Sequence, residues 1–529
     1  DESHNFRNRI AKYDENDELI MNRYFKLVHN VIKSGKNTKV LLLSATPVNN
    51  SLVDLKNQLS IITGDKDDAF NEEGISSIGY LLKKATQVIN DWEKDGNRKK
   101  DELLDNLPSD FYKLLEMMTI SRSRKHITNY YGTKNIGNFP KKNKPITYYP
   151  EIDSKNELLN FKNTNSLLEE LNLSVYTPTK FIKSEHLAYY INKYKLSGNR
   201  GGKLDFETQS KGLIYLHRVN LFKRLESSIY SFSETLKRLI ENIDRTIENL
   251  QKGRQIEENP EVEDDEEMYI ERSKYDIKVE HLRINAYLEE LYSDREIVEK
   301  IYNETLILLK EDRDKKIYEL EKIVEDKVKN TPYNDGNRKI LIFTAFADTA
   351  DYIYSKFSEK FTKKNINIAG VTGKGVKTTN KKVKEDFHSI LSAFSPKSKM
   401  KIEIPQEEQI DIIVATDCIS EGQNLQDCDT VINFDIQWNP VSLIQRFGRV
   451  DRIGSTNERI QMINFFPNAD LNDYLDLERR VKGKMTTLNI ASTGDEDMLN
   501  PEMNDFNFRK RQLERLREEV IEIEDTNDN

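Results

Sequence analysis

Short apolar runs in the last third of the chain carry the clearest structural signal. Each run has four to seven residues, rich in β-branched and aromatic side chains, and spacers of helical length separate several of them. Such runs are typical of strands buried on both faces of a parallel sheet. The five runs are Ile340–Phe343, Ile366–Val371, Ile410–Val414, Val431–Phe434 and Ile460–Phe466. With crossover helices expected at 348–364, 378–394 and 440–450, residues 335–490 are predicted to form a doubly wound α/β domain.

The first 65 residues predict half of a similar domain. The apolar run Val40–Leu43 leads directly into Ser44-Ala45-Thr46-Pro47, which fits a buried strand followed by a strand-end loop. Residues 66–150 are assigned to a helical protrusion or brace, and residues 491–529 to a C-terminal helix and tail.

Between these parts, residues 151–334 are predicted to form a large α-helical insertion. Apolar residues recur in steps of three and four from Leu213 to Ile243, and a second such pattern covers 271–328. We expect a long antiparallel helical hairpin, with 253–268 as a flexible link. Helical periodicity reports burial and not function. A plain helical bundle without any role in nucleic-acid contact therefore stays open beside one that contacts it.

Composition limits the class of protein without choosing the partner. The net charge is −9, but eight acids and no base fall within 257–267, so the rest of the chain is at −1. Because phosphate contact depends on local patches, this charge neither supports nor excludes nucleic acid. No apolar run is long enough to span a membrane, and Cys418 and Cys428 have no metal-site spacing. We expect a cytoplasmic protein in which both cysteines are reduced packing residues.

The segment 445–454, Gln-Arg-Phe-Gly-Arg-Val-Asp-Arg-Ile-Gly, is the most specific motif in the chain. Its forked, permanently charged arginines suit phosphate oxygens. It ends an ordered series that begins with Asp1-Glu2-Ser3-His4 and Ser44-Ala45-Thr46, followed by 340–346 and 415–425. In that order the segments resemble motifs II to VI of superfamily-two helicases. The ending Arg452-Ile453-Gly454 is most similar to the Swi/Snf-type DNA translocases.

The resemblance implies RecA-like domains and an ATP site that lies between two of them. It implies that Asp1 and Glu2 hold Mg²⁺, with Glu2 as the base that orients the attacking water. Arg449 and Arg452 correspond to arginine fingers, and Ser44 and Thr46 to the motif that couples nucleotide state to the DNA site. The residues assigned to ATP are Gly422, Gln445, Arg449 and Arg452.

The same resemblance implies contact with the DNA backbone through small polar groups of the motif IV and V loops. The residues assigned to DNA are Thr344, Phe346, Thr416, Ser420, Gln423, Asn424 and Trp438. For Trp438, core packing is the open alternative. The basic segment 121–126 suits either phosphate contact or a bracing helix, and Phe139-Pro140-Lys141-Lys142 is similar to a proline-lysine segment of these translocases.

The sequence contains no phosphate-binding loop of the form Gly-x-x-x-x-Gly-Lys-Ser/Thr; 370–378 has glycines and lysines at the wrong spacing. We therefore interpret the chain as the C-terminal part of an ATPase whose N-terminal half lies upstream, and we expect this part alone to be inactive. The expected function is ATP-dependent translocation on duplex DNA, with nuclease or phage-defence subunits as possible partners. An RNA-directed helicase and a non-catalytic nucleic-acid-binding scaffold are the alternatives.

Overall fold

The computed structural model divides the chain into two compact units. The first comprises residues 1–138, 438–444 and 478–529, and the second comprises 139–437 and 445–477. The described residues are 3–6, 9, 12–13, 19–35, 38–44, 52–94, 103, 105–120, 137, 139–159, 161–193, 206–253, 277–419, 423–436 and 440–467. The expected flexible link at 253–268, the basic segment 121–126 and the C-terminal helix lie almost entirely outside them.

The described part of the first unit is mainly helical. Its helices are α1 (Arg23–Leu27), α2 (Leu52–Thr63), α3 (Ile78–Lys94) and α5 (Ser109–Met118). Leu55, Leu82 and Phe111 are among the buried side chains that join α2, α3 and α5 into one apolar core.

The buried strand expected at Val40–Leu43 is not present. Leu41 is 77% exposed and Leu43 50% exposed, and no strand is assigned there. In the described part of this unit the strands are β1 (Lys12–Tyr13) and β2 (Leu19–Ile20), which pair with each other. Among the described residues, 40–43 have no sheet neighbour to cover their apolar side chains, although Leu43 does accept one hydrogen bond from the Ser3 amide at 2.8 Å.

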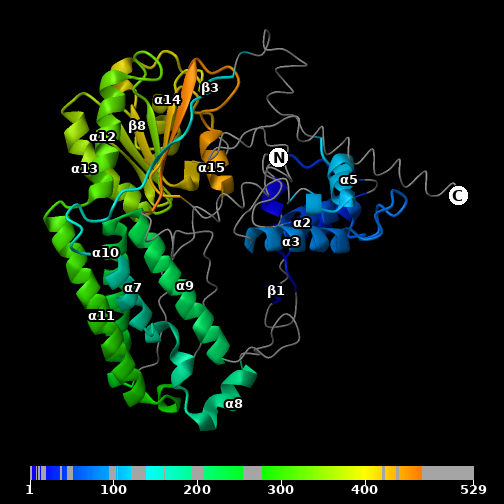
Figure 1. Cartoon of the computed structure of the whole chain (residues 1–529), viewed down its shortest axis with the longest axis vertical. Helices are drawn as coiled ribbons and strands as arrows, with labels where there is room; N and C mark the ends of the chain where they lie inside the picture. The colour runs from blue at the N-terminus through cyan, green and yellow to red at the C-terminus, as the bar shows by residue number, and fades with distance from the viewer. Residues whose placement is uncertain are drawn as a thin grey trace. The chain divides into compact units, whose positions relative to one another are not determined.

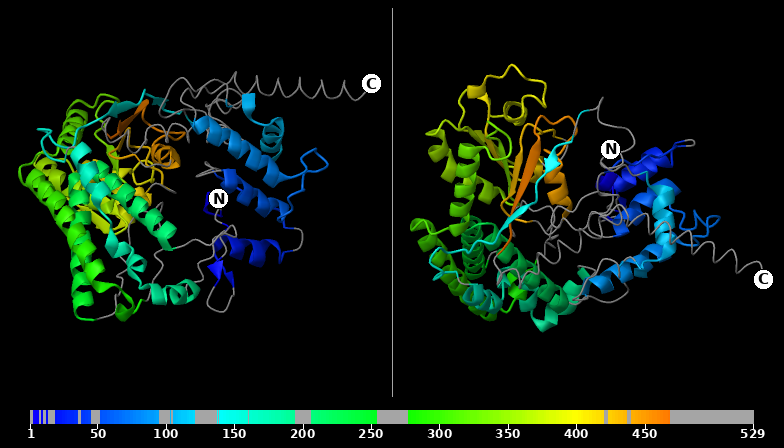
Figure 2. Two further views of the ribbon diagram at one scale, coloured as in Figure 1. Left: turned by 60° about the horizontal axis from the view of Figure 1, so that its bottom comes forward. Right: turned by 45° about the horizontal axis from the view of Figure 1, so that its top comes forward.

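The second unit contains the predicted doubly wound sheet. Its strands lie in the order β3-β10-β9-β5-β8-β6-β7, with β4 also paired to β10; every pairing is parallel except β6 with β7. The bounds are β3 Lys141–Lys142, β4 Ile146–Tyr148, β5 Ile340–Phe343, β6 Ile368–Thr372, β7 Gly375–Thr378, β8 Ile412–Ala415, β9 Thr430–Asn433 and β10 Arg459–Phe465. The segment that carries β3 and β4 runs beside β10 at the sheet edge (Figure 2, right, cyan beside orange).

Helices cover both faces of this sheet. Helices α12 (Lys315–Asn330) and α13 (Ala347–Thr362) lie on one face (Figure 1). Their apolar side chains share a core with Ile340 and Ile342. The opposite face includes Phe343, whose ring lies 5.1 Å from the guanidinium carbon of Arg446 in α15 (Pro440–Phe447). Helix α14 is Phe387–Phe394, much shorter than the expected 378–394, because Asp386 caps its first turn by accepting from the Ser389 amide.

The helical insertion consists of shorter elements than the apolar pattern predicts. The pattern from Leu213 to Ile243 is divided between α9 (Phe206–Ser227) and α10 (Ile229–Gln251), and Ser228 between them is extended and caps α10. The second pattern is divided between α11 (Ile284–Lys310) and α12. Helices α10 and α11 are antiparallel, since Asp244 pairs with Arg295 while Ser233, nearer the start of α10, bonds Thr305. The insertion also contains the smaller helices α7 (Phe161–Glu170) and α8 (Ser184–Lys193).

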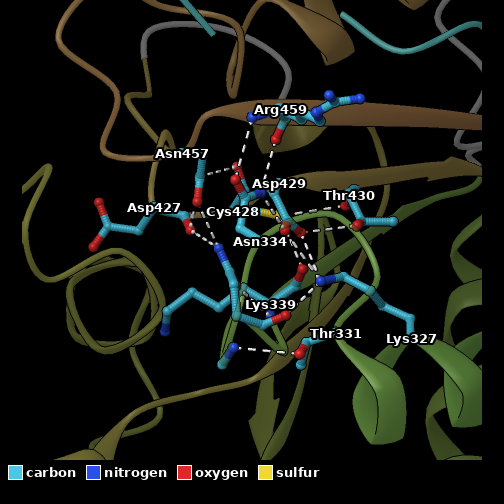
Figure 3. Close-up of polar contacts among 12 residues, drawn as sticks. Lys327, Thr331, Asn334, Lys339, Asp427, Cys428, Asp429, Thr430, Asn457 and Arg459 are labelled. Carbon is cyan, nitrogen blue, oxygen red and sulfur yellow. Dashed lines mark hydrogen bonds and ion pairs between the residues drawn. The ribbon is translucent and has the colours of Figure 1, made fainter. Parts of the chain in front are cut away.

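A dense cluster of polar side chains lies at the amino-terminal ends of the parallel strands (Figure 3). The buried ammonium of Lys327 lies 2.9 Å from Asp429, immediately before β9. Asn334 donates to Asp429 and to the carbonyl of Arg459, both at 2.8 Å. These bonds join α12 and the loop after it to the starts of β9 and β10.

Among the described residues, no helix is both long and apolar enough to cross a bilayer.

Candidate functional site: the motif V and VI loops

The segment after β8 and the helix α15 are joined by a buried arginine. Arg446 is fully buried; its Nε donates to Asp417 Oδ1 at 2.6 Å and its Nη2 to Asp417 Oδ2 at 2.9 Å. Its Nη1 donates to the side chain of Asn433, at the end of β9. This two-pronged ion pair fixes the loop that follows β8 to the end of α15, directly before the segment that contains the motif VI arginines.

Arg446 and Asp417 were not singled out from the sequence. Arginine is almost never fully buried without a partner, so its burial identifies a structural ion pair. In the sequence, Arg446 is visible as a third arginine beside Arg449 and Arg452. Its partner Asp417 could not be found from the motif, because it lies 29 residues away in the chain.

Arg449 brings together three of the residues expected at the site. Its Nε donates to the carbonyl of Gln445 at 3.2 Å and its Nη1 to the carbonyl of Gln423 at 3.3 Å. The amide of Leu425 donates back to the carbonyl of Arg449 at 3.0 Å. Motifs V and VI thus form one hydrogen-bonded unit at the carboxyl-terminal side of the sheet, where ligands of such sheets bind.

Cationic groups gather around Gln423. Lys399 donates to its side-chain oxygen at 2.7 Å. Burial lowers the pKa of Lys399, and the positive charge of Arg452 lowers it further, so these two cations share one local field. Arg452 itself is half-buried and donates to the carbonyl of Gly448 at 3.2 Å. A concentration of positive charge of this kind fits a phosphate group. The sequence did not identify Lys399.

The proline-lysine segment has a structural partner in motif VI. Lys142, in β3, lies 2.9 Å from the buried carboxylate of Asp451, and its ammonium is 5.8 Å from the Phe447 ring centre. Because β3 pairs with β10, this contact ties the end of the motif VI segment to the sheet edge.

Thr344 and Phe346, expected at the DNA, are both buried. Thr344 Oγ1 donates to Asp435 at 2.5 Å, and the neighbouring Ala345 amide donates to the other oxygen of that carboxylate at 2.7 Å. The Phe346 ring lies 3.9 Å beneath the guanidinium of Arg224. Both side chains are enclosed by protein, and a nucleic-acid contact of Thr344 and Phe346 stays a prediction.

The other predicted residues have varied surroundings. Thr416 is buried and Asn424 exposed, and Ser44 is half-buried beside Leu43. Cys428 is buried as expected, but Cys418 is exposed in the loop after β8, so it is not a packing residue. Six predicted residues lie outside the described part of the chain: Asp1, Glu2, Thr46, Ser420, Gly422 and Trp438.

The magnesium ligands expected at Asp1 and Glu2 therefore remain a prediction. Among the residues that the structure describes, no group of three or more His, Cys, Asp or Glu side chains is arranged to hold a metal ion.

Comparison with known proteins finds one domain family that matches this chain. Residues 316–454 match the helicase conserved C-terminal domain. This range contains the sheet from β5 to β9 together with Arg446, Arg449 and Arg452. Residues 316–454 are thus similar to the C-terminal domain of helicases.

Particular relatives match over short segments. The "Uncharacterized ATP-dependent helicase YqhH" of Bacillus subtilis is 44% identical over 50 residues, which are 10% of this chain and 9% of that protein. The "DEAD-box ATP-dependent RNA helicase CshA" of Geobacillus kaustophilus is 34% identical over 125 residues (22% and 26%). The "RNA polymerase-associated protein RapA" of Pectobacterium atrosepticum is 32% identical over 83 residues (16% and 9%). The matched segments thus span about a quarter or less of these curated relatives.

Two solved structures are distant matches. The C-terminal part of the Fun30 ATPase domain covers 67% of this chain and 97% of its own, at 13% identity and a TM-score of 0.30. The Hef helicase domain of Pyrococcus furiosus covers 66% and 60%, at 16% identity and a TM-score of 0.32.

Proposed function

We propose that the chain is the C-terminal part of an ATP-dependent translocase of the Swi/Snf type that moves on duplex DNA. The second unit supplies Arg449 and Arg452 to a triphosphate, and the complete protein supplies the phosphate-binding loop that is missing from this sequence. Asp1 and Glu2 take the Mg²⁺ and attacking-water roles. ATP-driven closure and opening of the two lobes advances the motor along the DNA.

The joined motif V and VI segments are the observation that carries this proposal. Arg449 spans the carbonyls of Gln445 and Gln423, and Arg446 holds Asp417 through two bonds. A change in position of motif VI is therefore transmitted to the motif V loop, which the proposal assigns to the DNA backbone. That linkage is what a motor needs between nucleotide and nucleic acid.

The decisive experiment substitutes an arginine in the complete protein. Arg452→Ala should lower DNA-stimulated ATP turnover by about 10³ or more, the effect of removing an arginine finger. Arg459→Ala, an exposed arginine at the start of β10, is the matched control and should leave turnover unchanged. A near-normal rate in the Arg452 variant would remove the assigned role and with it the motor interpretation.

An RNA-directed helicase is the second candidate, favoured by the 125-residue match to the RNA helicase CshA. Measuring ATPase stimulation by duplex DNA and by RNA of equal length separates the two, since only the RNA helicase should respond to RNA alone. A scaffold without turnover would show neither response, although the retained Arg449 and Arg452 oppose a decayed site.

The 529-residue chain alone should hydrolyse no ATP, because backbone amides of the phosphate-binding loop hold the phosphates in such motors. DNA-stimulated hydrolysis by the purified chain would contradict this. A Gly-Lys-Thr or Gly-Lys-Ser loop in the upstream coding sequence would support it.

A further inference from the structure

The junction between α9 and α10 is inserted against the carboxyl-terminal ends of β5 and β9. Ser227 is fully buried, and its Oγ donates to Asp435 Oδ2 at 2.6 Å. The same carboxylate accepts from Thr344, at the end of β5, and from the Ala345 amide. A residue of the helical insertion thus completes the hydrogen bonding of a carboxylate that belongs to the helicase domain.

The hydroxyl groups at this junction form a chain with one direction. Ser228 Oγ lies 2.9 Å from Thr349 Oγ1, which lies 2.7 Å from Ser227 Oγ. Each hydroxyl donates one hydrogen, and the hydrogen of Ser227 goes to Asp435. The chain therefore runs from Ser228 through Thr349 and Ser227 to Asp435, and each bond polarises the next one.

The junction is held from two further sides. Lys316, in α12, donates to the carbonyls of Glu226, at 2.5 Å, and Ser227, at 3.2 Å. Arg224 covers the Phe346 ring and lies 3.4 Å from Asp348 in the first turn of α13. These contacts hold the junction between α9 and α10 in place. A shift of the insertion would therefore also shift the hydroxyl of Ser227.

Asp435 also touches the candidate site through its backbone. Its carbonyl accepts from Arg446 Nη1 at 3.4 Å, and Arg446 holds Asp417. A continuous set of contacts therefore runs from the insertion, through Ser227 and Asp435, to both the Thr344 loop and the joined motif V and VI segments.

We propose that Ser227 is a positioning residue through which the helical insertion sets the geometry of the Thr344 loop and of motif VI. The insertion is then part of the working motor and not a passive bundle. The effect of Ser227 on ATP turnover rests on the proposed function. The structural coupling of the insertion to the Thr344 loop and to motif VI does not depend on that function.

Hydrogen exchange on the 529-residue chain tests the structural coupling without any activity. Ser227→Ala should raise amide exchange at 344–347 by about tenfold, which is the scale of one lost hydrogen bond to a charged group, and should also raise exchange at 435–436. Ser233→Ala is the matched control, because Ser233 is also buried but bonds Thr305 of α11 inside the insertion. Unchanged exchange at 344–347, or an equal rise in the control, would overturn the proposal.

Steady-state ATPase assays on the complete protein test the consequence for turnover. Ser227→Ala should lower kcat by about tenfold with KM for ATP unchanged, because the loops are mispositioned while nucleotide binding is retained. Ser233→Ala should change neither. A rise in KM alone, or equal losses in both variants, would contradict a positioning role. An inactive wild-type protein would instead refute the proposed function and leave the exchange result to decide the coupling.

Discussion

The buried carboxyl of Glu226 should make stability fall as pH rises. Glu226 lies at the end of α9, and its Oε1 is 3.4 Å from the Lys316 ammonium. Burial raises the pKa of Glu226, Lys316 lowers it and the charge of Asp435 raises it again, with a net value of about 8 against 4.5 for the free side chain. Between these two values the folded protein holds a proton that the unfolded chain has released.

Linkage fixes the sign and the size of the effect. Because the folded state binds the extra proton, this contribution is fully present below about pH 4.5 and is lost progressively up to about pH 8. At about 1.4 kcal/mol per pH unit, the loss is at most about 5 kcal/mol. Above pH 8 the folded state has lost the proton too, and this contribution changes no further.

The variant Glu226→Gln isolates this effect, since the amide has nearly the same shape and does not titrate. Denaturant unfolding from pH 5 to pH 9 should show similar stabilities at pH 5 and a variant that becomes more stable than wild type as pH rises. Glu299→Gln, on the exposed surface of α11, is the control and should follow wild type throughout. A difference between Glu226→Gln and wild type that is constant with pH would refute the reasoning.

Three further predictions concern buried groups. Arg446→Met leaves Asp417 without its two-pronged partner and should cost about 3 kcal/mol in denaturant unfolding; an unchanged midpoint would contradict the pair. Lys327→Met leaves the carboxylate of Asp429 buried without its cation and should lower the free energy of unfolding by about 3–5 kcal/mol. ATP turnover of the folded complete protein should stay normal, because this pair lies at the strand ends opposite to the candidate site. Burial raises the pKa of the Cys428 thiol to about 12, so native labelling at pH 8 should modify only the other, exposed cysteine, and modification of both would count against this packing.

The sheet was predictable because its strands are buried on both faces. The apolar run Ile340–Phe343 coincides with β5, and the other four runs each overlap a strand with boundaries shifted by one or two residues. The broken helix was not predicted, because apolar spacing continues through Ser228 as if the helix did. Ser228 caps α10 because its backbone is extended, and the spacing of apolar residues carries no information on that backbone conformation.

Some motif residues of the candidate site lie together, while their roles toward ATP and DNA stay predictions; the supporting contacts were not predicted. Gln423, Gln445 and Arg449 come together as the motif order implies. The partners of Thr344 and Ser227 could not be found in this way, because Asp435 lies 91 and 208 residues from them in the chain. The local sequence around a threonine at the end of a strand does not show whether its hydroxyl will hydrogen-bond to protein or to a phosphate.

The polar groups at the two ends of the parallel strands have different roles. At the amino-terminal ends of the strands, Lys327 and Asn334 both bond Asp429 (Figure 3). The Lys327–Asp429 ion pair is almost wholly buried. At the carboxyl-terminal ends, Asp435 draws its donors from a strand end and from a helix of the insertion, while Lys399 and Arg452 place positive charge together. Substitutions at the first end should therefore act on stability alone. Substitutions at the second should separate turnover from stability, because there the contacts between the insertion and the sheet lie beside groups suited to phosphate.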